Sequence, residues 1–160
     1  MSLPKLYLET AIPSYLVARP SRDEIMRGQQ AATREWWEHG RDACELFVSQ
    51  FVDIEAERGD AEMARARIAA IDGLPRLPVT ESVRELASEI LGAGLIPIQA
   101  EVDAMHIAVA AVHRMDMLLT WNCAHIHNID ISRQIERICA RAGWLCPAIC
   151  TPFDLLKLEP

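Results

Sequence analysis

The sequence lacks any apolar run close to the roughly eighteen residues that a membrane-spanning helix needs. It also lacks the pattern of a signal peptide, because Glu9 interrupts the short apolar stretch after Lys5. No internal repeat and no linker interrupts the 160 residues. We therefore expect a single domain over residues 1–160, located in the cytoplasm and without contact to a membrane.

Cysteine is scarce and odd in number, with five residues that lie mostly in apolar sequence. This usage fits a reducing compartment better than a disulfide framework. Basic residues are also too few for a broad nucleic-acid surface, since the formal net charge is −7. A local basic surface is still compatible with this total, because acids gathered in one site leave the rest of the surface less acidic.

Short apolar runs that read as strands alternate with longer amphipathic segments that read as helices. The expected strands are 3–8, 44–49, 76–79, 116–120 and 146–150, and the expected helices are 12–16, 21–40, a segment from 50 that carries Glu55 and Glu57, 60–71, 81–91, an apolar helix starting near Asp103, and 131–142. Ser21, with Glu24 three residues later, reads as a capping box for the second helix. The alternation predicts an α/β fold with three layers, in which helices cover both faces of a mostly parallel sheet of four to five strands.

The segment from Glu101 to Asn128 organises the predicted site. An apolar helix leads away from Asp103, and the buried strand 116–120 returns to Trp121 and Asn122 over nearly the same length. Asp103 and Asn122 should therefore lie at the carboxyl edge of the sheet, which is where open α/β folds bind ligands. Glu9, directly after the first strand, and Glu55, in the helix that leaves the second, should reach the same edge.

Crowded carboxylates either take up protons or share a cation. Oxygen ligands without cysteine or clustered histidine suit Mg²⁺ or Mn²⁺ better than zinc, and such an ion assists phosphodiester cleavage. The sequence thus predicts that Glu9, Glu55 and Asp103 bind the metal and that Asn122 joins them as a fourth catalytic residue. The alternative is chance placement, since acidic residues are common at the ends of strands.

Neighbouring polar residues have two interpretations each. Thr10 and Thr120 either hydrogen-bond the ligands from a second shell or serve as caps at strand ends, and His106 either bonds a site carboxylate or is a buried structural histidine. His125 and His127 are expected in a polar loop, because no nearby cysteine pair completes a zinc site. Glu57 and Glu101 compete with Glu55 and Asp103 for a ligand role, and we expect both to face solvent.

Arg27, Arg34 and Arg41 recur every seven residues and so follow one stripe of the second helix. They form either a solvated face or an RNA-binding surface, since guanidinium groups match phosphate oxygens. Trp36 and Trp37 either stack on bases or pack into the core or a subunit contact.

Three groups of residues give the chain a resemblance to a known family. They are Leu6-Tyr7-Leu8-Glu9-Thr10 with Ile12-Pro13-Ser14-Tyr15-Leu16, Val48-Ser49 with Glu55, and Asp103-x-x-His106-Ile107-Ala108 with Leu118-Leu119-Thr120-Trp121-Asn122. In this order and spacing they resemble PIN-domain proteins of the VapC toxin type. The resemblance implies a three-layer α/β/α fold, a Mg²⁺-dependent ribonuclease that acts on RNA, an antitoxin protein as partner, and a homodimer. Its metal-binding acids would fall on Glu9, Glu55, Asp103 and Asn122.

The sequence departs from the family pattern at two of these positions, where aspartate is usual. Glu9 is longer by one methylene, and Asn122 supplies an oxygen without a charge. An alternative is therefore an attenuated or inactive module of the same fold that binds RNA or a protein. A phosphatase or receiver-like domain is a third alternative, but it requires a phosphoacceptor aspartate after the first strand, where Glu9 stands.

Overall fold

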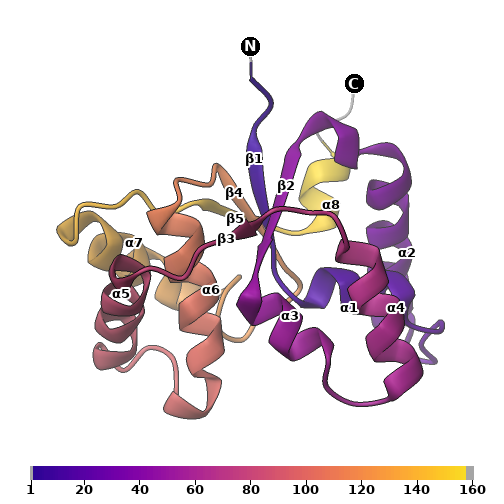
Figure 1. Ribbon diagram of the computed structural model, residues 1–160, viewed down its shortest axis with the longest axis horizontal. Helices are drawn as coiled ribbons and strands as arrows, with labels where there is room; N and C mark the ends of the chain where they lie inside the picture. Colours follow the sequence, from indigo (N-terminus) through magenta and orange to yellow (C-terminus); the bar gives the residue numbers. More distant parts are fainter. Residues whose placement is uncertain (1, 158–160) are drawn as a thin grey trace.

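The computed structural model describes residues 2–157 and is built around one five-stranded sheet (Figure 1). Its strands are β1 (Lys5–Leu8), β2 (Glu45–Ser49), β3 (Arg76–Leu77), β4 (Met117–Leu119) and β5 (Ala148–Cys150). They are all parallel, in the order β3-β2-β1-β4-β5. The predicted α/β fold with a parallel sheet is therefore confirmed.

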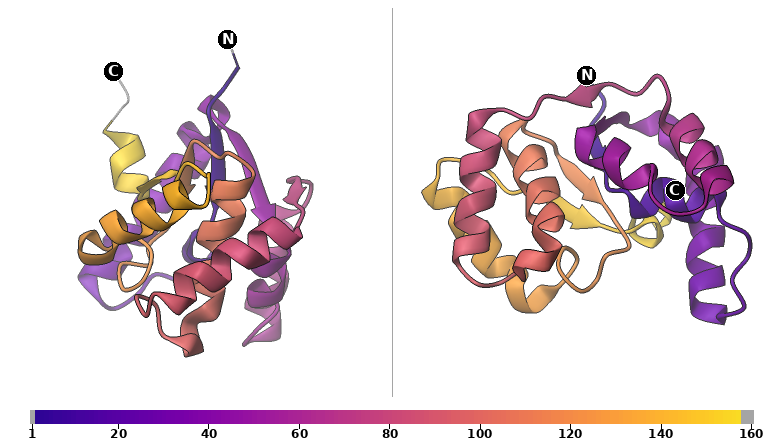
Figure 2. Two further views of the ribbon diagram at one scale, coloured as in Figure 1. Left: turned by 90° about the vertical axis from the view of Figure 1, so that its left-hand side faces the viewer. Right: turned by 60° about the horizontal axis from the view of Figure 1, so that its bottom comes forward.

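Helices cover both faces of this sheet. They are α1 (Ala11–Val17), α2 (Glu24–His39), α3 (Gln50–Ala56), α4 (Ala61–Ile71), α5 (Glu81–Gly92), α6 (Glu101–Val112), α7 (Ile129–Arg141) and α8 (Pro152–Leu156), with short 3-10 turns η1 (Arg41–Ala43) and η2 (Ile98–Ala100). Figures 1 and 2 show α5, α6 and α7 on one side and α1, α2, α4 and α8 on the other. The arrangement has three layers, as the sequence predicts. Within residues 2–157, no helix has the length and apolar character needed to cross a membrane.

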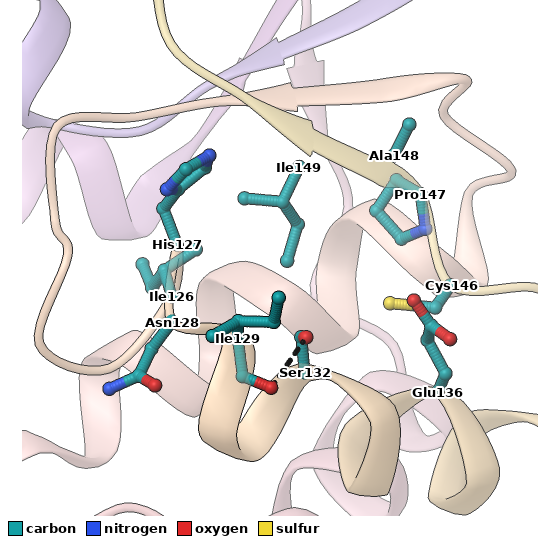
Figure 3. A pocket seen from close by; sticks show the side chains of 10 residues that line it. All are labelled: Ile126, His127, Asn128, Ile129, Ser132, Glu136, Cys146, Pro147, Ala148 and Ile149. Atoms are coloured by element: carbon teal, nitrogen blue, oxygen red, sulfur yellow. Dashed lines mark hydrogen bonds between the residues drawn. The ribbon is translucent and has the colours of Figure 1, made fainter.

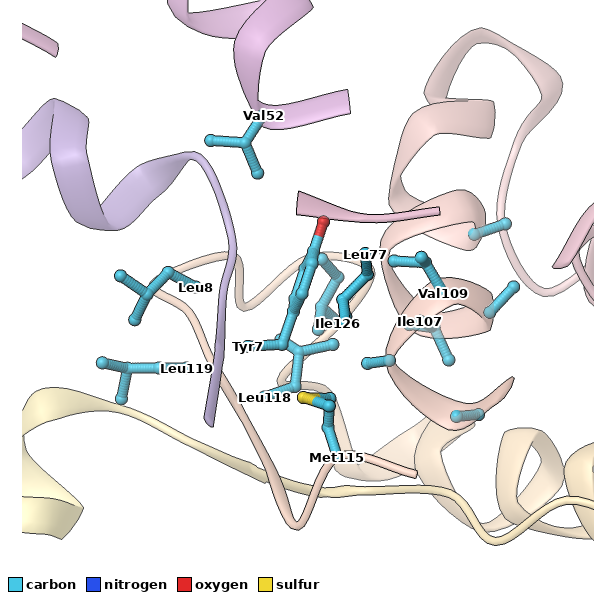
Figure 4. Close-up of a cluster of buried hydrophobic side chains, with 14 of the residues drawn as sticks. Tyr7, Leu8, Val52, Leu77, Ile107, Val109, Met115, Leu118, Leu119 and Ile126 are labelled. Atoms are coloured by element: carbon cyan, nitrogen blue, oxygen red, sulfur yellow. The ribbon is translucent and has the colours of Figure 1, made fainter. Parts of the chain in front are cut away.

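The core lies where the central strand β1 meets α6. Leu6, Tyr7 and Leu8 have no exposed surface, and neither do His106 and Ile107. Helix α6 packs against α5 on the side away from the sheet, so it is buried nearly all round, as its apolar sequence requires. Figure 4 shows Tyr7 among the hydrophobic side chains of this cluster.

The start of α2 differs from the expected capping box. The helix begins at Glu24, and Asp23 is its N-cap, with a carboxylate that accepts a hydrogen bond from the Met26 amide at 3.0 Å. The Ser21 hydroxyl instead accepts from the Asp23 amide. Ser21 is wrong as the cap because the chain turns into the helix two residues later, where aspartate provides the same acceptor.

The register of the strands brings three polar chain segments to one edge. Tyr7 pairs with Phe47 on one side, and Leu8 pairs with Leu119 on the other. The Glu9 amide then donates to the Leu119 carbonyl at 3.1 Å. The residues that follow β1, β2 and β4 consequently meet at the carboxyl edge, and the candidate site is built there.

Candidate functional site

Three ionisable side chains converge at the carboxyl edge of the sheet. They are Glu9 directly after β1, Glu55 in the last turn of α3, and His106 on α6, and one ligand atom of each lies within 4.8 Å of the others. Glu9 and Glu55 are two of the predicted metal ligands, and the sequence predicted their meeting. Of the two interpretations of His106, the structure agrees with both, because the imidazole is fully buried and is in hydrogen-bond contact with Glu55.

Glu9 is nearly buried and is held by two donors. Its Oε1 accepts from the Thr120 hydroxyl at 2.6 Å, and its Oε2 accepts from the Ala11 amide at 3.1 Å. Burial raises the pKa of Glu9, against the opposing effects of His106 and of these two hydrogen bonds. The negative charge on Glu9 is therefore costly until a cation joins it.

Glu55 is more exposed and more strongly supported. Its Oε1 accepts from the Thr10 hydroxyl at 2.6 Å and lies 2.6 Å from His106 Nε2. Burial alone raises the pKa of Glu55, but the hydrogen bonds and charges around it, His106 first among them, bring the pKa below its usual value. Within residues 2–157 no hydrogen bond reaches Oε2 of Glu55, so this ionised carboxylate has one oxygen available for a ligand.

A buried chain of hydrogen bonds stands behind Glu55. His106 Nδ1 lies 2.6 Å from the Tyr7 hydroxyl, which lies 2.7 Å from the Ser49 hydroxyl. Burial raises the pKa of Tyr7 well above its ordinary value, so the phenol stays protonated. Ser49 Oγ already accepts from the Phe51 amide, so its own proton is free to point at Tyr7.

These contacts assign the protons of the chain. Ser49 donates to Tyr7, Tyr7 donates to His106 Nδ1, and His106 Nε2–H donates to Glu55. In this assignment every proton has an acceptor. The Nε2 proton of His106 fixes the orientation of the Glu55 carboxylate, which is what second-shell partners of metal ligands do.

Tyr7 and Ser49 are not among the site residues predicted from the sequence. The signal was a tyrosine inside an otherwise apolar strand, because a buried tyrosine hydroxyl usually has a hydrogen-bond partner. The strand pattern alone does not tell which residue that partner is.

Asp103 lies outside the group that Glu9, Glu55 and His106 form. It is in the first turn of α6, and its Oδ2 lies 2.7 Å from His125 Nδ1. The contact places Asp103 beside the loop that follows β4, as the lengths of helix and strand predict. Its partner in the structure is the imidazole of His125.

Asn122 uses its side-chain oxygen to shape the loop. Oδ1 accepts from the amides of Ala124 and His125 at 3.2 and 3.0 Å, and the Asn122 carbonyl accepts from the His127 amide. These bonds fold residues 122–127 into a compact turn. The side-chain oxygen of Asn122, which the sequence predicted to join the catalytic residues, is therefore engaged in hydrogen bonds within this turn.

The remaining predicted residues fall into two groups. Thr10 and Thr120 hydrogen-bond carboxylates of the site, which is the first of their two interpretations, and Thr10 gives no side-chain cap to α1. Glu57 and Glu101 are both exposed, as expected.

The three arginines belong to two elements. Arg27 and Arg34 lie on α2, whereas Arg41 lies in η1, with its guanidinium carbon 4.5 Å from the centre of the Trp37 ring. Arg27 donates to the Ser21 carbonyl. The predicted single helical stripe thus breaks where α2 ends at His39, and the RNA-binding role of these arginines stays a prediction.

A separate pocket of about 240 Å³ lies along β5 and the start of α7. Figure 3 shows its lining, which comprises Ile126, His127, Asn128, Ile129, Ser132, Glu136, Cys146, Pro147, Ala148 and Ile149. None of the predicted site residues lines this pocket. The site at the carboxyl edge is therefore defined by its converging polar side chains and not by this hollow.

No protein-family model matches the sequence, and a search of curated proteins gives no match.

Proposed function

We propose that this protein is a divalent-metal-dependent endoribonuclease of the PIN type, in which Glu9 and Glu55 hold Mg²⁺ or Mn²⁺. The observation that carries the proposal is the convergence of these two carboxylates, from separate elements, to within 4.8 Å at the carboxyl edge of a parallel sheet. This edge is the usual ligand-binding edge of such sheets.

The donor atoms suit a hard divalent ion. Mg²⁺ is commonly bound by one or two carboxylates, with water and substrate phosphate completing its coordination. Glu55 offers the oxygen that accepts no hydrogen bond within residues 2–157, and Glu9 offers a buried carboxylate whose pKa is raised by burial in spite of its two hydrogen bonds. When bound, such an ion polarises a phosphoryl oxygen and lowers the pKa of a coordinated water.

The protein's own contribution is to hold both carboxylates in one geometry. Thr10 and His106 fix Glu55, while Thr120 and the Ala11 amide fix Glu9. Neither carboxylate has to reorganise when the substrate arrives, which lowers the barrier of a reaction governed by positioning. Asp103, whose Oδ2 is bonded to His125, is placed outside the pair of ligands in this proposal.

The test is RNA cleavage by the purified protein with Mn²⁺ or Mg²⁺, combined with thermal unfolding in the same buffers. Metal at a hundredfold excess over its Kd should stabilise the fold by about 2.7 kcal/mol. A chelator should stop cleavage and remove the stabilisation. Glu55→Gln should abolish both, and the matched control Glu57→Gln, at an exposed position two residues away, should change neither.

Two outcomes argue against the proposal. Cleavage that survives Glu55→Gln indicates a contaminating nuclease. A melting temperature that does not respond to either metal indicates that the protein binds neither ion. Stabilisation by metal together with RNA binding but no cleavage favours the alternative, a binding module of the same fold. The antitoxin partner, the role as a toxin and the homodimer, which rest on the resemblance alone, stay predictions.

A further inference from the structure

Three aromatic rings form a cluster next to the carboxyl edge of the sheet. Tyr15 on α1 stacks on Trp121, which follows β4, with ring centroids 6.0 Å apart and planes at 16°. Phe153 meets Trp121 in a T-shaped contact, with centroids 5.1 Å apart and planes at 80°. Trp121 is nearly buried, and its Nε1–H donates to the Thr33 hydroxyl at 2.8 Å. It is therefore a fixed support on which the Tyr15 ring rests.

The outer end of the Tyr15 ring reaches solvent. Its hydroxyl makes no hydrogen bond within residues 2–157, and no buried side-chain oxygen or nitrogen in that part of the chain lacks a hydrogen-bond partner. The hydroxyl is therefore accessible to water. Among the same residues, Trp121 is the only aromatic ring that pairs with Tyr15. The stack of Trp121 and Tyr15 can thus be extended by one more flat group that arrives from solvent.

Two chain segments place the Tyr15 ring beside Glu9. The Ala11 amide, in the first turn of α1, donates to Glu9 Oε2 at 3.1 Å, and Tyr15 lies four residues later on the same face of the helix, about 6 Å along its axis. The residue before Trp121 is Thr120, whose hydroxyl donates to Glu9 at 2.6 Å. Each member of the stacked pair is therefore one turn or one residue away from a group that holds Glu9.

The charge of Glu9 also acts on the Tyr15 hydroxyl through space. Burial raises the pKa of Tyr15, and the negative charge of Glu9 raises it further. Because such an effect weakens with distance, it is a second indication that the ring lies beside this carboxylate. The phenol stays uncharged, so it is a neutral contact surface at an edge whose carboxylates repel phosphate until a cation joins them.

We propose that Tyr15 is an RNA-binding residue and that an unpaired base of the substrate stacks on its ring, with Trp121 as the support behind it. The proposal rests on the proposed nuclease function. A nucleotide whose phosphate lies at Glu9 and Glu55 brings its own base, or that of its neighbour, within reach of the ring. Every base has a flat aromatic face, so the contact accepts any base, whereas the faces of a base inside a duplex are covered by neighbouring pairs.

The stacked base positions the RNA strand and takes no part in bond cleavage. Trp121, held by its hydrogen bond to Thr33, keeps the Tyr15 ring in place before the substrate arrives, so binding costs little side-chain entropy. The contact is the same in the bound substrate and in the transition state. Its loss should therefore raise KM and leave kcat unchanged.

The experiment measures KM and kcat for cleavage of a fluorescein-labelled single-stranded RNA oligonucleotide with Mn²⁺. It also measures the Kd of the same RNA by fluorescence anisotropy with a chelator present, so that no strand is cut. Tyr15→Leu keeps an apolar side chain but removes the flat ring, and it should raise KM and Kd by about 5–150-fold, the range for a lost base stack. Tyr15→Phe keeps the ring and should restore both values to near those of the wild type.

Oligonucleotides with a single abasic site, moved along the strand, test the contact from the side of the RNA. At one position the abasic RNA should bind the wild-type protein about as weakly as the intact RNA binds Tyr15→Leu. The two changes together should weaken binding no further, because both remove the same stack. The wild-type arm of this test does not depend on the folding of any variant.

Trp144 provides a matched control. It is also a partly buried aromatic residue, but it precedes β5 and so lies at the amino edge of the parallel sheet, opposite the proposed site. Trp144→Leu removes an aromatic ring of the protein without touching the stack of Tyr15 and Trp121. It should change neither KM nor Kd.

The outcomes separate this inference from the proposed function. Unchanged KM and Kd in Tyr15→Leu, with Glu55→Gln inactive, overturn the role of Tyr15 and leave the nuclease intact. A lower kcat with unchanged KM and Kd also overturns it, because the ring then supports the site and does not bind the RNA. Binding that weakens in Tyr15→Leu, for a wild-type protein that does not cut RNA, supports the stack and contradicts the nuclease. A wild-type protein that neither binds nor cuts RNA overturns both.

Discussion

The Tyr7 hydroxyl and His106 Nδ1 lie 2.6 Å apart in the interior, and neither residue has any exposed surface. This contact joins the central strand to α6 and determines which nitrogen of His106 faces Glu55. The geometry of a partly exposed site is thereby set by two side chains that no substrate touches.

Replacing Tyr7 by phenylalanine tests the connection directly. Tyr7→Phe keeps the packed ring but leaves His106 Nδ1 and the Ser49 hydroxyl without their partner. We expect the free energy of unfolding to fall by about 1–3 kcal/mol, the cost of an unsatisfied buried polar group, and the metal-induced shift in melting temperature to shrink. Denaturant titration with and without Mn²⁺ measures both.

Tyr15→Phe is the control for that substitution. Tyr15 is only partly buried, and its hydroxyl has no hydrogen bond within the described part of the chain. Its loss should change stability and metal response little. Equal effects of the two substitutions would show that the contact between Tyr7 and His106 has no special role.

His106 is expected to orient Glu55 without binding the metal itself. Loss of an outer partner of a ligand usually weakens metal binding by about 10–100-fold, whereas loss of the ligand abolishes it. His106→Gln should thus weaken the affinity for Mn²⁺ within that range, and Glu55→Gln should eliminate it. Isothermal titration with Mn²⁺ distinguishes the two, and complete loss of binding in both variants would make His106 a ligand.

The sequence predicted the framework of the site better than its contacts. The alternation of apolar strands with helices places Glu9 and Glu55 at the carboxyl edge, because each follows a strand of a parallel sheet. That inference needs only the direction of the strands. It holds even though several strands are shorter than expected, such as β4 at Met117–Leu119.

The partners of Asp103 and Asn122 were beyond the reach of the sequence pattern. His125 bonds Asp103 only because Asn122 folds the loop after β4 into a compact turn. Such a loop path depends on several weak hydrogen bonds, and no periodicity encodes it. The same reason explains the misplaced cap of α2, where Ser21 and Asp23 offer equivalent acceptors and only the path of the chain chooses between them.

The raised pKa of Glu9 makes stability depend on pH in a defined direction. A glutamate in an unfolded chain has a pKa of about 4.3, and burial raises the pKa of Glu9 in the folded protein. The stability linked to this group is fully present below the unfolded pKa and is lost as the pH rises through the folded pKa. The side chain introduced by Glu9→Gln is neutral at every pH, so the variant does not lose this stability as the pH rises.

The free energy of unfolding of Glu9→Gln relative to wild type should therefore increase as the pH rises from about 4 and then level off. Denaturant titrations across the pH range, with a chelator present to exclude metal, measure the difference. A difference that decreases with rising pH would mean that the folded protein stabilises the ionised form of Glu9.

The length of Glu9 fits its surroundings. Its two oxygens reach the Thr120 hydroxyl and the Ala11 amide at once, and aspartate would withdraw the carboxylate from both. Glu9→Asp should consequently lower cleavage, and a displacement of about 1 Å in an active site can cost about 10²-fold in rate. A large gain in cleavage would instead identify the natural chain as an attenuated enzyme.

Thr120 links the two parts of the edge, and its substitution should affect both. Its buried hydroxyl donates to Glu9 at 2.6 Å and accepts from the Asn122 amide at 2.8 Å, so Thr120→Val removes both bonds while keeping the shape of the side chain. We expect a loss of about 1–3 kcal/mol in the free energy of unfolding and a weaker Mn²⁺ response. Thr120→Ser retains the hydroxyl and should keep the Mn²⁺ response. If valine and serine weaken that response equally, a general loosening of the strand accounts for the effect, and the hydroxyl does not hold Glu9 in place for the metal.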